Sequence, residues 1–162
     1  MLIALYLIAI VAANLIVVQF GPQVSILTSF LFIGLDLTSR DGLHEKWHGK
    51  HLWWKMLLLI GTGSVLSYIL NRNAGPIALA SFIAFAGAGL ADTVIYSILG
   101  NKTRFVKING SNVVSSTVDS FLFPLIAFGL PMLWPIVFGQ LIAKVAGGFV
   151  WSFILVKWNL IK

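Results

Sequence analysis

Residues 1–20 read MLIALYLIAIVAANLIVVQF, an apolar stretch with almost no interruption before Gly21 and Pro22. A helix that crosses a bilayer needs about 20 apolar residues, so this stretch predicts a transmembrane helix. It carries no basic residues at its start and no small-residue cleavage site followed by polar sequence, which argues against a removable signal peptide. We therefore interpret it as the first span of a membrane protein.

Five further apolar stretches follow along the chain. They are continuous rather than alternating, which favours helices over the strands of an outer-membrane barrel. Of the 162 residues, 59% are hydrophobic and 10% are charged, whereas a soluble domain carries about a quarter charged residues. The sequence therefore predicts an all-α integral membrane protein in which residues 1–162 form a single domain of six transmembrane helices. The expected spans are about 2–20, 24–38, 52–70, 76–99, 111–130 and 132–157.

Basic residues are concentrated in the connections on one side of these spans. Nine of the eleven lysines and arginines lie in the 39–55 connection, the 100–110 connection or the C-terminal end, whereas the opposite side has only Arg72 and Lys144 lies within a span. Because cytoplasmic loops are enriched in lysine and arginine, we expect both termini to face the cytoplasm. The net charge of +6 is therefore explained by basic loops that orient the protein in the membrane. We expect no nucleic-acid partner.

Besides the lysines at span ends, three carboxylates and one lysine lie within the predicted spans. Such a group costs at least about 2.5–3.5 kcal/mol at the bilayer centre, and its default interpretation is functional. Asp119 lies roughly 13 Å from the start of its span at 1.5 Å per residue, and Lys144 enters from the opposite side to a similar depth. Asp92 is nearer the end of its span, and Asp36 lies at the end of the second. Because lipid cannot satisfy polar groups, we expect them to converge on an interior cavity.

Polar side chains accompany these charges at helical spacing. Asn112 and Ser116 precede Asp119 on one predicted helix face, and Gln140 precedes Lys144 by four residues. The structural alternative is that Asp119 and Lys144 form a neutralising pair between two helices, with the amides and serines as helix contacts worth about 0.6 kcal/mol each. The number of such groups in a short chain favours a binding site instead.

The segment His44-Glu45-Lys46-Trp47-His48 matches the pattern H-E-x-x-H. On a helix, its two histidines bind zinc and the glutamate acts as a base. Here the pattern lies in a charged connection rather than in a span, which favours a chance match. We expect no metal site, no cofactor, no catalytic residues and no enzymatic activity. A membrane-bound zinc metalloprotease is one alternative, and the substrate-binding subunit of an ATP-driven vitamin importer is another.

Several segments carry a family resemblance: Asp36-Leu37-Thr38-Ser39-Arg40-Asp41, Ala91-Asp92-Thr93, Asn109-Gly110-Ser111-Asn112 and Ser115-Ser116-Thr117-Val118-Asp119, with Gln140 and Lys144. Together they resemble the queuosine precursor transporter family, also named the vitamin uptake transporters, in its compact branch. The resemblance extends from the second span to the last. It implies six spans and import of 7-cyano-7-deazaguanine or a related 7-deazaguanine across the bacterial cytoplasmic (inner) membrane. It leaves open a homodimer and proton coupling.

The resemblance implies a site suited to a guanine-like base. A carboxylate can accept both the ring N–H and the adjacent NH₂ of such a base, and Asp119 is the first choice for this role, ahead of Asp92. Phe32, Phe85 or Phe121 would stack on the flat ring. A donor to the ring carbonyl would come from Gln140, Asn112 or Lys144. The substrate-binding candidates are Asp119, Asp92, Asn112, Ser111, Ser116, Gln140, Lys144, Asp36 and Asn14.

Overall fold

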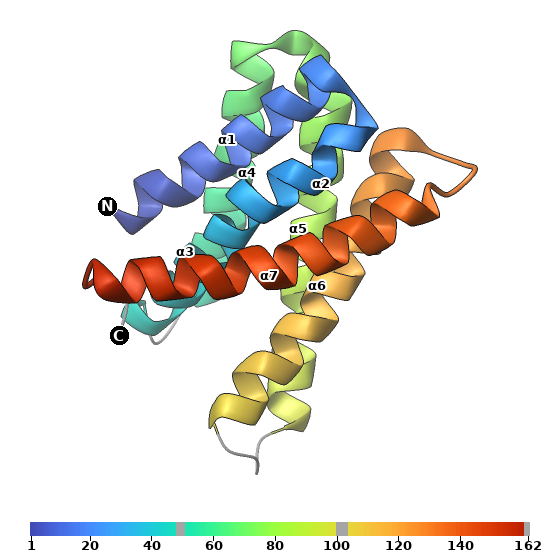
Figure 1. The fold of residues 1–162 in the computed structure, drawn as a ribbon. Helices are drawn as coiled ribbons and strands as arrows, with labels where there is room; N and C mark the ends of the chain where they lie inside the picture. Colours follow the sequence, from blue (N-terminus) through green and yellow to red (C-terminus); the bar gives the residue numbers. More distant parts are fainter. Residues whose placement is uncertain (48–50, 100–103, 161–162) are drawn as a thin grey trace.

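The computed structural model describes residues 1–47, 51–99 and 104–160, and over these ranges the chain is helical with no strands. Figure 1 shows the helices packed as a bundle in which α5 and α6 run side by side. Within these described ranges, five helices are long and apolar enough to cross a membrane, which confirms an all-α fold with several candidate transmembrane helices. The elements are α1 (Leu2–Phe20), η1 (Pro22–Val24), α2 (Ser25–Thr28), η2 (Ser29–Ile33), α3 (Gly34–Lys46), α4 (Leu52–Leu70), η3 (Arg72–Ala74), α5 (Gly75–Ile98), α6 (Arg104–Phe128) and α7 (Trp134–Lys157).

The second predicted span, 24–38, takes a different form. It consists of consecutive helical pieces, α2, the π-helical segment η2 and α3, and it runs on to Lys46. Its apolar part is short because α3 introduces Asp36 and Arg40 soon after the π-helical segment. None of its pieces is among the five long apolar helices. The count of six spans and the cytoplasmic position of the termini therefore stay predictions.

Helix α7 lies along this broken segment and satisfies part of its backbone. The indole Nε1 of Trp151 donates a hydrogen bond of 2.7 Å to the carbonyl of Leu31, inside η2. The Thr38 hydroxyl contacts the carbonyl of Gly148 at 3.2 Å. A π-helical turn leaves backbone groups without their regular helical partners, and such turns are frequent at functional sites. The contacts with α7 thus stabilise an irregular helix in an otherwise regular bundle.

Glycines allow the two backbones to touch where these elements cross. A Cβ atom on Gly34 would lie 2.5 Å from the carbonyl carbon of Gly147, and a Cβ atom on Gly147 would collide with the carbonyl oxygen of Phe30. Small residues are common where membrane helices approach closely, because no side chains separate the backbones. The crossing at Gly34 and Gly147 therefore sets how α7 packs on the second segment.

The buried apolar core lies towards one end of the bundle. It contains Leu2 from the start of α1 and Leu155 from the end of α7, together with Ile10, Leu43 and Met56. The start of α1 and the end of α7 therefore lie at the same end, as Figure 1 also shows. Many large apolar side chains remain exposed, as expected for a surface covered by lipid. Examples are Leu58, Ile69, Ile98, Phe138, Ile142, Phe149 and Phe153.

Candidate functional site

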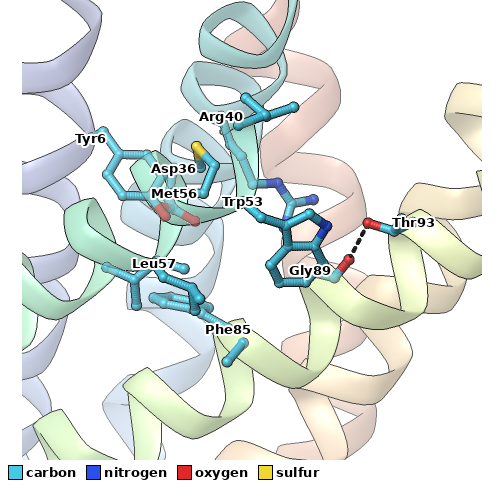
Figure 2. Close-up of a pocket in the computed structure, with 12 residues that line it drawn as sticks. Tyr6, Asp36, Arg40, Trp53, Met56, Leu57, Phe85, Gly89 and Thr93 are labelled. Carbon is cyan, nitrogen blue, oxygen red and sulfur yellow. Dashed lines mark hydrogen bonds between the residues drawn. The ribbon is translucent and has the colours of Figure 1, made fainter. Parts of the chain in front are cut away.

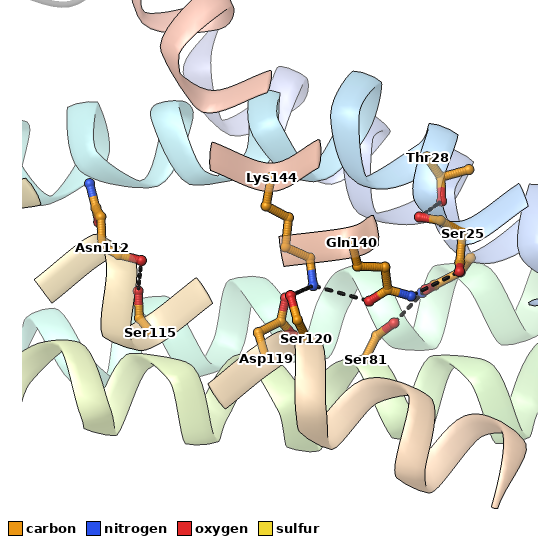
Figure 3. Close-up of polar contacts among 10 residues, drawn as sticks. Ser25, Thr28, Ser81, Asn112, Ser115, Asp119, Ser120, Gln140 and Lys144 are labelled. Carbon is orange, nitrogen blue, oxygen red and sulfur yellow. Dashed lines mark hydrogen bonds and ion pairs between the residues drawn. The ribbon is translucent and has the colours of Figure 1, made fainter. Parts of the chain in front are cut away.

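Asp119 on α6 and Lys144 on α7 form a buried ion pair (Figure 3). The Nζ atom of Lys144 lies 2.8 Å from Oδ2 of Asp119, and their side chains are 2% and 6% exposed for lysine and aspartate respectively. The same Nζ donates to the Ser120 hydroxyl at 3.0 Å and to Oε1 of Gln140 at 3.3 Å. These contacts use all three donors of an ammonium group. The similar depth that the sequence predicts for the two charges is confirmed.

The second oxygen of the Asp119 carboxylate differs from the first. Oδ1 is buried and has no hydrogen-bond partner within the described part of the chain. A buried polar atom without a partner costs about 1–3 kcal/mol, and more if it is charged. Asp119 therefore offers one acceptor atom that the described residues do not use.

Gln140 connects this ion pair to the beginning of the second segment. Its Nε2 donates to the Ser25 hydroxyl at 2.8 Å, and that hydroxyl donates to the carbonyl of Pro22 at 2.5 Å. Because Nε2 donates to Ser25 and Oε1 accepts from Lys144, the hydrogen-bond network fixes the orientation of the Gln140 amide. The polar residues of α6, α7 and α2 are thus joined in one chain of contacts (Figure 3).

Asn14 on α1 contacts two further helices in the same region. Its Nδ2 donates to the Ser67 hydroxyl of α4 at 3.1 Å, and its Oδ1 accepts from the Ser81 hydroxyl of α5 at 2.6 Å. All three side chains are buried. Asn14 therefore holds α1, α4 and α5 together, which is the structural role that the sequence left as an alternative for such amides.

These networks line a common cavity, which we call the Lys144 cavity. It encloses about 300 Å³ of empty space, including any opening to the exterior. Its wall combines hydroxyl, amide and charged groups with the rings of Phe85 and Phe123. The lining residues are Ala13, Asn14, Val17, Ser25, Thr28, Ser29, Ile33, Ser81, Phe85, Asp119, Phe123, Gln140 and Lys144.

A larger cavity lies on the other side of Phe85, and we call it the Arg40 cavity (Figure 2). It encloses about 510 Å³, again including its opening. Tyr6, Asp36 and Arg40 supply buried polar groups, and the Tyr6 hydroxyl hydrogen bonds with the Asp36 carboxylate. Most of the remaining wall is apolar. The lining residues are Tyr6, Asp36, Arg40, Leu52, Trp53, Met56, Leu57, Ile60, Phe85, Ala86, Gly89 and Thr93.

The predicted site residues are therefore divided. Asn14, Asp119, Gln140 and Lys144 line the Lys144 cavity, whereas Asp36 lines the Arg40 cavity. The expectation of one shared cavity is wrong, because the irregular second segment distributes its polar residues between two levels of the bundle. Thr28 and Asp36, both in the second segment, line different cavities.

Four further candidates line neither of these two cavities. Asp92 is partly exposed on α5, and Asn112 is partly exposed on α6, where its backbone carbonyl accepts from the Ser115 hydroxyl at 3.2 Å. Ser111 and Ser116 are buried. In Figure 1 the first turns of α6 run beside α5, away from α1 and α7.

The aromatic residues also separate into two groups. Phe85 lines both cavities, whereas Phe121 is 41% exposed and packs on Trp134 with ring centroids 6.3 Å apart. Phe32 packs against the buried core. Phe123, which the sequence analysis missed, lines the Lys144 cavity. Phe123 follows Asp119 by four residues and so shares its helix face, whereas Phe121, two residues after Asp119, lies on a different face.

Arg40 and Tyr6 are the other residues that the sequence analysis did not assign to a site. Arg40 was predicted to set orientation and lies in a segment that carries the family resemblance, but it was not a site candidate; it is 5% exposed and follows Asp36 by four residues. Residues four apart on a helix are neighbours, so a carboxylate and a guanidinium at this spacing were the available signal. Tyr6 had no such signal.

The H-E-x-x-H pattern lies partly outside the described residues. His48 and the side chains of His44 and Glu45 lie outside the described residues. Among the side chains that the structure does describe, no group of three histidine, cysteine, aspartate or glutamate residues is placed to hold a metal ion.

Comparison with known proteins gives one match. The family model described as "Putative vitamin uptake transporter" matches residues 10–157, which is most of the chain. No curated protein and no solved structure matches the chain.

Proposed function

The chain belongs to the vitamin uptake transporter family, and we propose that it imports a queuosine precursor, 7-cyano-7-deazaguanine or a related 7-deazaguanine, across the bacterial cytoplasmic membrane. The family and the five long apolar helices make it a multi-pass membrane protein of a transporter family. In the proposal, α2, η2 and α3 together form a sixth crossing, and both termini face the cytoplasm.

One observation carries the choice of substrate site. The Asp119 carboxylate is held by Lys144 through one oxygen, while Oδ1 is buried without a partner among the described residues, and Asp119 lines the Lys144 cavity. A guanine-like base presents a ring N–H beside an exocyclic NH₂, and acidic side chains accept hydrogen bonds from such base edges. We assign this role to Asp119.

The structure changes the role that we propose for Lys144. Its three donors are already directed at Asp119, Ser120 and Gln140. A direct bond from Lys144 to the ring carbonyl would require one of these contacts to break. Lys144 is therefore a positioning residue, which orients the carboxylate and compensates its charge. Phe85 and Phe123 supply apolar faces for the flat ring.

Such a site would discriminate strongly between related bases. A site built to hydrogen-bond a substrate N–H rejects an analogue that lacks it, because a buried protein group is then left without its partner. The Asp119 carboxylate has this character because its side chain is buried: one oxygen contacts Lys144, and Oδ1 has no partner among the described residues.

The test is uptake of labelled 7-cyano-7-deazaguanine by cells that lack their own transporter. We expect the wild-type chain to restore uptake and Asp119→Asn to abolish it. The matched control is Asp92→Asn, the same chemical change at a carboxylate that lines neither described cavity. Membrane levels of each variant are measured by immunoblot. Full uptake by Asp119→Asn at normal protein level would disprove the proposed site.

A second measurement separates this proposal from a subunit that needs an energising partner. The purified protein alone is reconstituted into liposomes, and entry of the labelled base is followed. Entry without any other protein supports a self-sufficient transporter. Binding without entry would instead indicate a substrate-binding subunit.

A further inference from the structure

The Arg40 cavity shares only Phe85 with the substrate site proposed above. Its polar groups are a carboxylate and a guanidinium of opposite charge, together with the Tyr6 hydroxyl, and all three side chains are at most 5% exposed. The rest of the wall is mostly apolar and includes Met56 and Leu57. A largely apolar cavity with a few convergent polar groups is the usual form of a small-molecule site.

The two cavities follow one another along the helix axes. On α1, Tyr6 lines the Arg40 cavity and Asn14 lines the Lys144 cavity. On α5, Gly89 lines the Arg40 cavity and Ser81 lines the Lys144 cavity. Each pair is eight positions apart in the sequence, which corresponds to about 12 Å at 1.5 Å per residue. In the second segment, Asp36 and Arg40 likewise lie beyond the residues of the Lys144 cavity. The Arg40 cavity is therefore nearer the end that carries the basic connections, which we expect to be cytoplasmic.

Phe85 on α5 lines both described cavities, and its side chain is only 7% exposed. It lies between Ser81 and Gly89 along the helix, at the level where one cavity gives way to the other. Its ring therefore forms part of the wall that divides them.

We propose that the Arg40 cavity is a second binding site for the transported heterocycle, occupied between the Lys144 cavity and the cytoplasm, with Phe85 between the two sites. The inference rests on the proposed function for the identity of the ligand. The site takes a flat, uncharged heterocycle that has a donor edge and an acceptor edge.

The chemistry of the wall suits such a ligand. Asp36 can accept from an N–H or NH₂ group, and the guanidinium of Arg40 can donate through its planar fork to a carbonyl or another acceptor. The two opposite charges cancel, so the site has no net charge with which to favour an ionised ligand. Trp53 and Phe85 provide aromatic surface for stacking.

The absence of cysteine from the sequence allows a direct test. Ala86, which lines the Arg40 cavity and not the Lys144 cavity, is replaced in the variant Ala86→Cys, and its reaction with a thiol reagent is timed in the purified protein. We expect 7-cyano-7-deazaguanine to slow the reaction at least tenfold at saturation. The control is Asn73→Cys, an exposed position in η3, whose reaction rate should not change with the ligand.

Two double variants show whether the ligand itself occupies the cavity. In Ala86→Cys with Asp119→Asn, protection should persist, because the Arg40 cavity does not use Asp119. In Ala86→Cys with Arg40→Gln, protection should require at least tenfold more ligand. Arg40→Lys keeps the positive charge if the glutamine variant does not fold, and it should still weaken protection because it lacks the planar fork. Protection that disappears with Asp119→Asn, or that is unchanged in both Arg40 variants, overturns the proposal.

The outcomes also separate this inference from the proposed function. If the wild-type protein takes up 7-cyano-7-deazaguanine but Ala86→Cys is not protected at concentrations that saturate uptake, the second site is wrong and the function stands. If the wild-type protein shows no uptake but Ala86→Cys is protected, the site stands and the transported substrate is wrong.

Discussion

The ammonium of Lys144 lies 2.8 Å from a carboxylate oxygen of Asp119, so a charge from α6 and a charge from α7 neutralise each other inside the bundle. Removal of one partner from a buried ion pair leaves an uncompensated charge and costs about 3–5 kcal/mol, whereas removal of both is milder. This difference separates the structural contribution of the pair from its contribution to transport.

We therefore expect Lys144→Met to lower the free energy of unfolding by about 3 kcal/mol. The double variant Asp119→Asn with Lys144→Gln should lose less stability than the sum of the single variants, yet should remain inactive in uptake. Thermal unfolding in detergent and uptake in cells are measured side by side. Uptake restored together with stability in the double variant would show that the pair is only structural.

The second prediction concerns the exocyclic amino group of the base. An analogue without this group leaves part of the Asp119 carboxylate unsatisfied, so it should compete for uptake at least a hundredfold more weakly than the parent compound. Competition is measured against labelled 7-cyano-7-deazaguanine. Equal competition by both compounds would mean that Asp119 does not contact this edge.

The third prediction compares two adjacent glycines. Gly147→Ala should strongly destabilise the fold, because its Cβ atom would meet the carbonyl oxygen of Phe30, whereas nothing lies within 4 Å of a Cβ atom on Gly148. Replacement of glycine by alanine within a helix otherwise stabilises by roughly 0.5–1 kcal/mol, so Gly148→Ala should be neutral or slightly stabilising. Thermal unfolding of both variants measures the difference. Similar stability of the two would contradict the close crossing of η2 and α7.

The fourth prediction concerns the π-helical segment. Trp151→Phe keeps the aromatic ring but removes the donor to the Leu31 carbonyl, so it should cost about 0.5–1.5 kcal/mol of stability. The control is Trp158→Phe, which is made at an exposed position after the end of α7. Hydrogen exchange should increase in residues 29–33 of the first variant only. Unchanged exchange there would show that Trp151 does not stabilise the segment.

The fifth prediction concerns the partition between the cavities. Phe85→Ala should weaken binding of the base by about 1–3 kcal/mol, which is roughly 5- to 150-fold, through loss of stacking. Phe85→Leu retains apolar volume and should preserve folding while still reducing affinity. The control is Phe121→Ala, because Phe121 is partly exposed against Trp134 and lines neither described cavity. Equal affinity in all three variants would remove Phe85 from the site.

Much of the architecture is predictable from the sequence because its causes are local. Hydropathy alone locates α1 and α4 at their observed bounds, 2–20 and 52–70. The constant rise of a helix also brings Asp119 and Lys144 to one depth, which the ion pair confirms. The ends of the second segment were less predictable, because its polar residues lie in a helix that continues beyond the apolar stretch.

The tertiary structure alone decided how the polar groups are shared. Hydrophobicity does not show which face of a membrane helix points inward, because lipid is as apolar as a protein core and helices associate through close packing and polar contacts. The crossing of η2 and α3 with α7 at Gly34 and Gly147 sets which faces meet. That packing places Asp119 and Asp36 in separate cavities, leaves Asp92 outside both, and puts Phe85 between them.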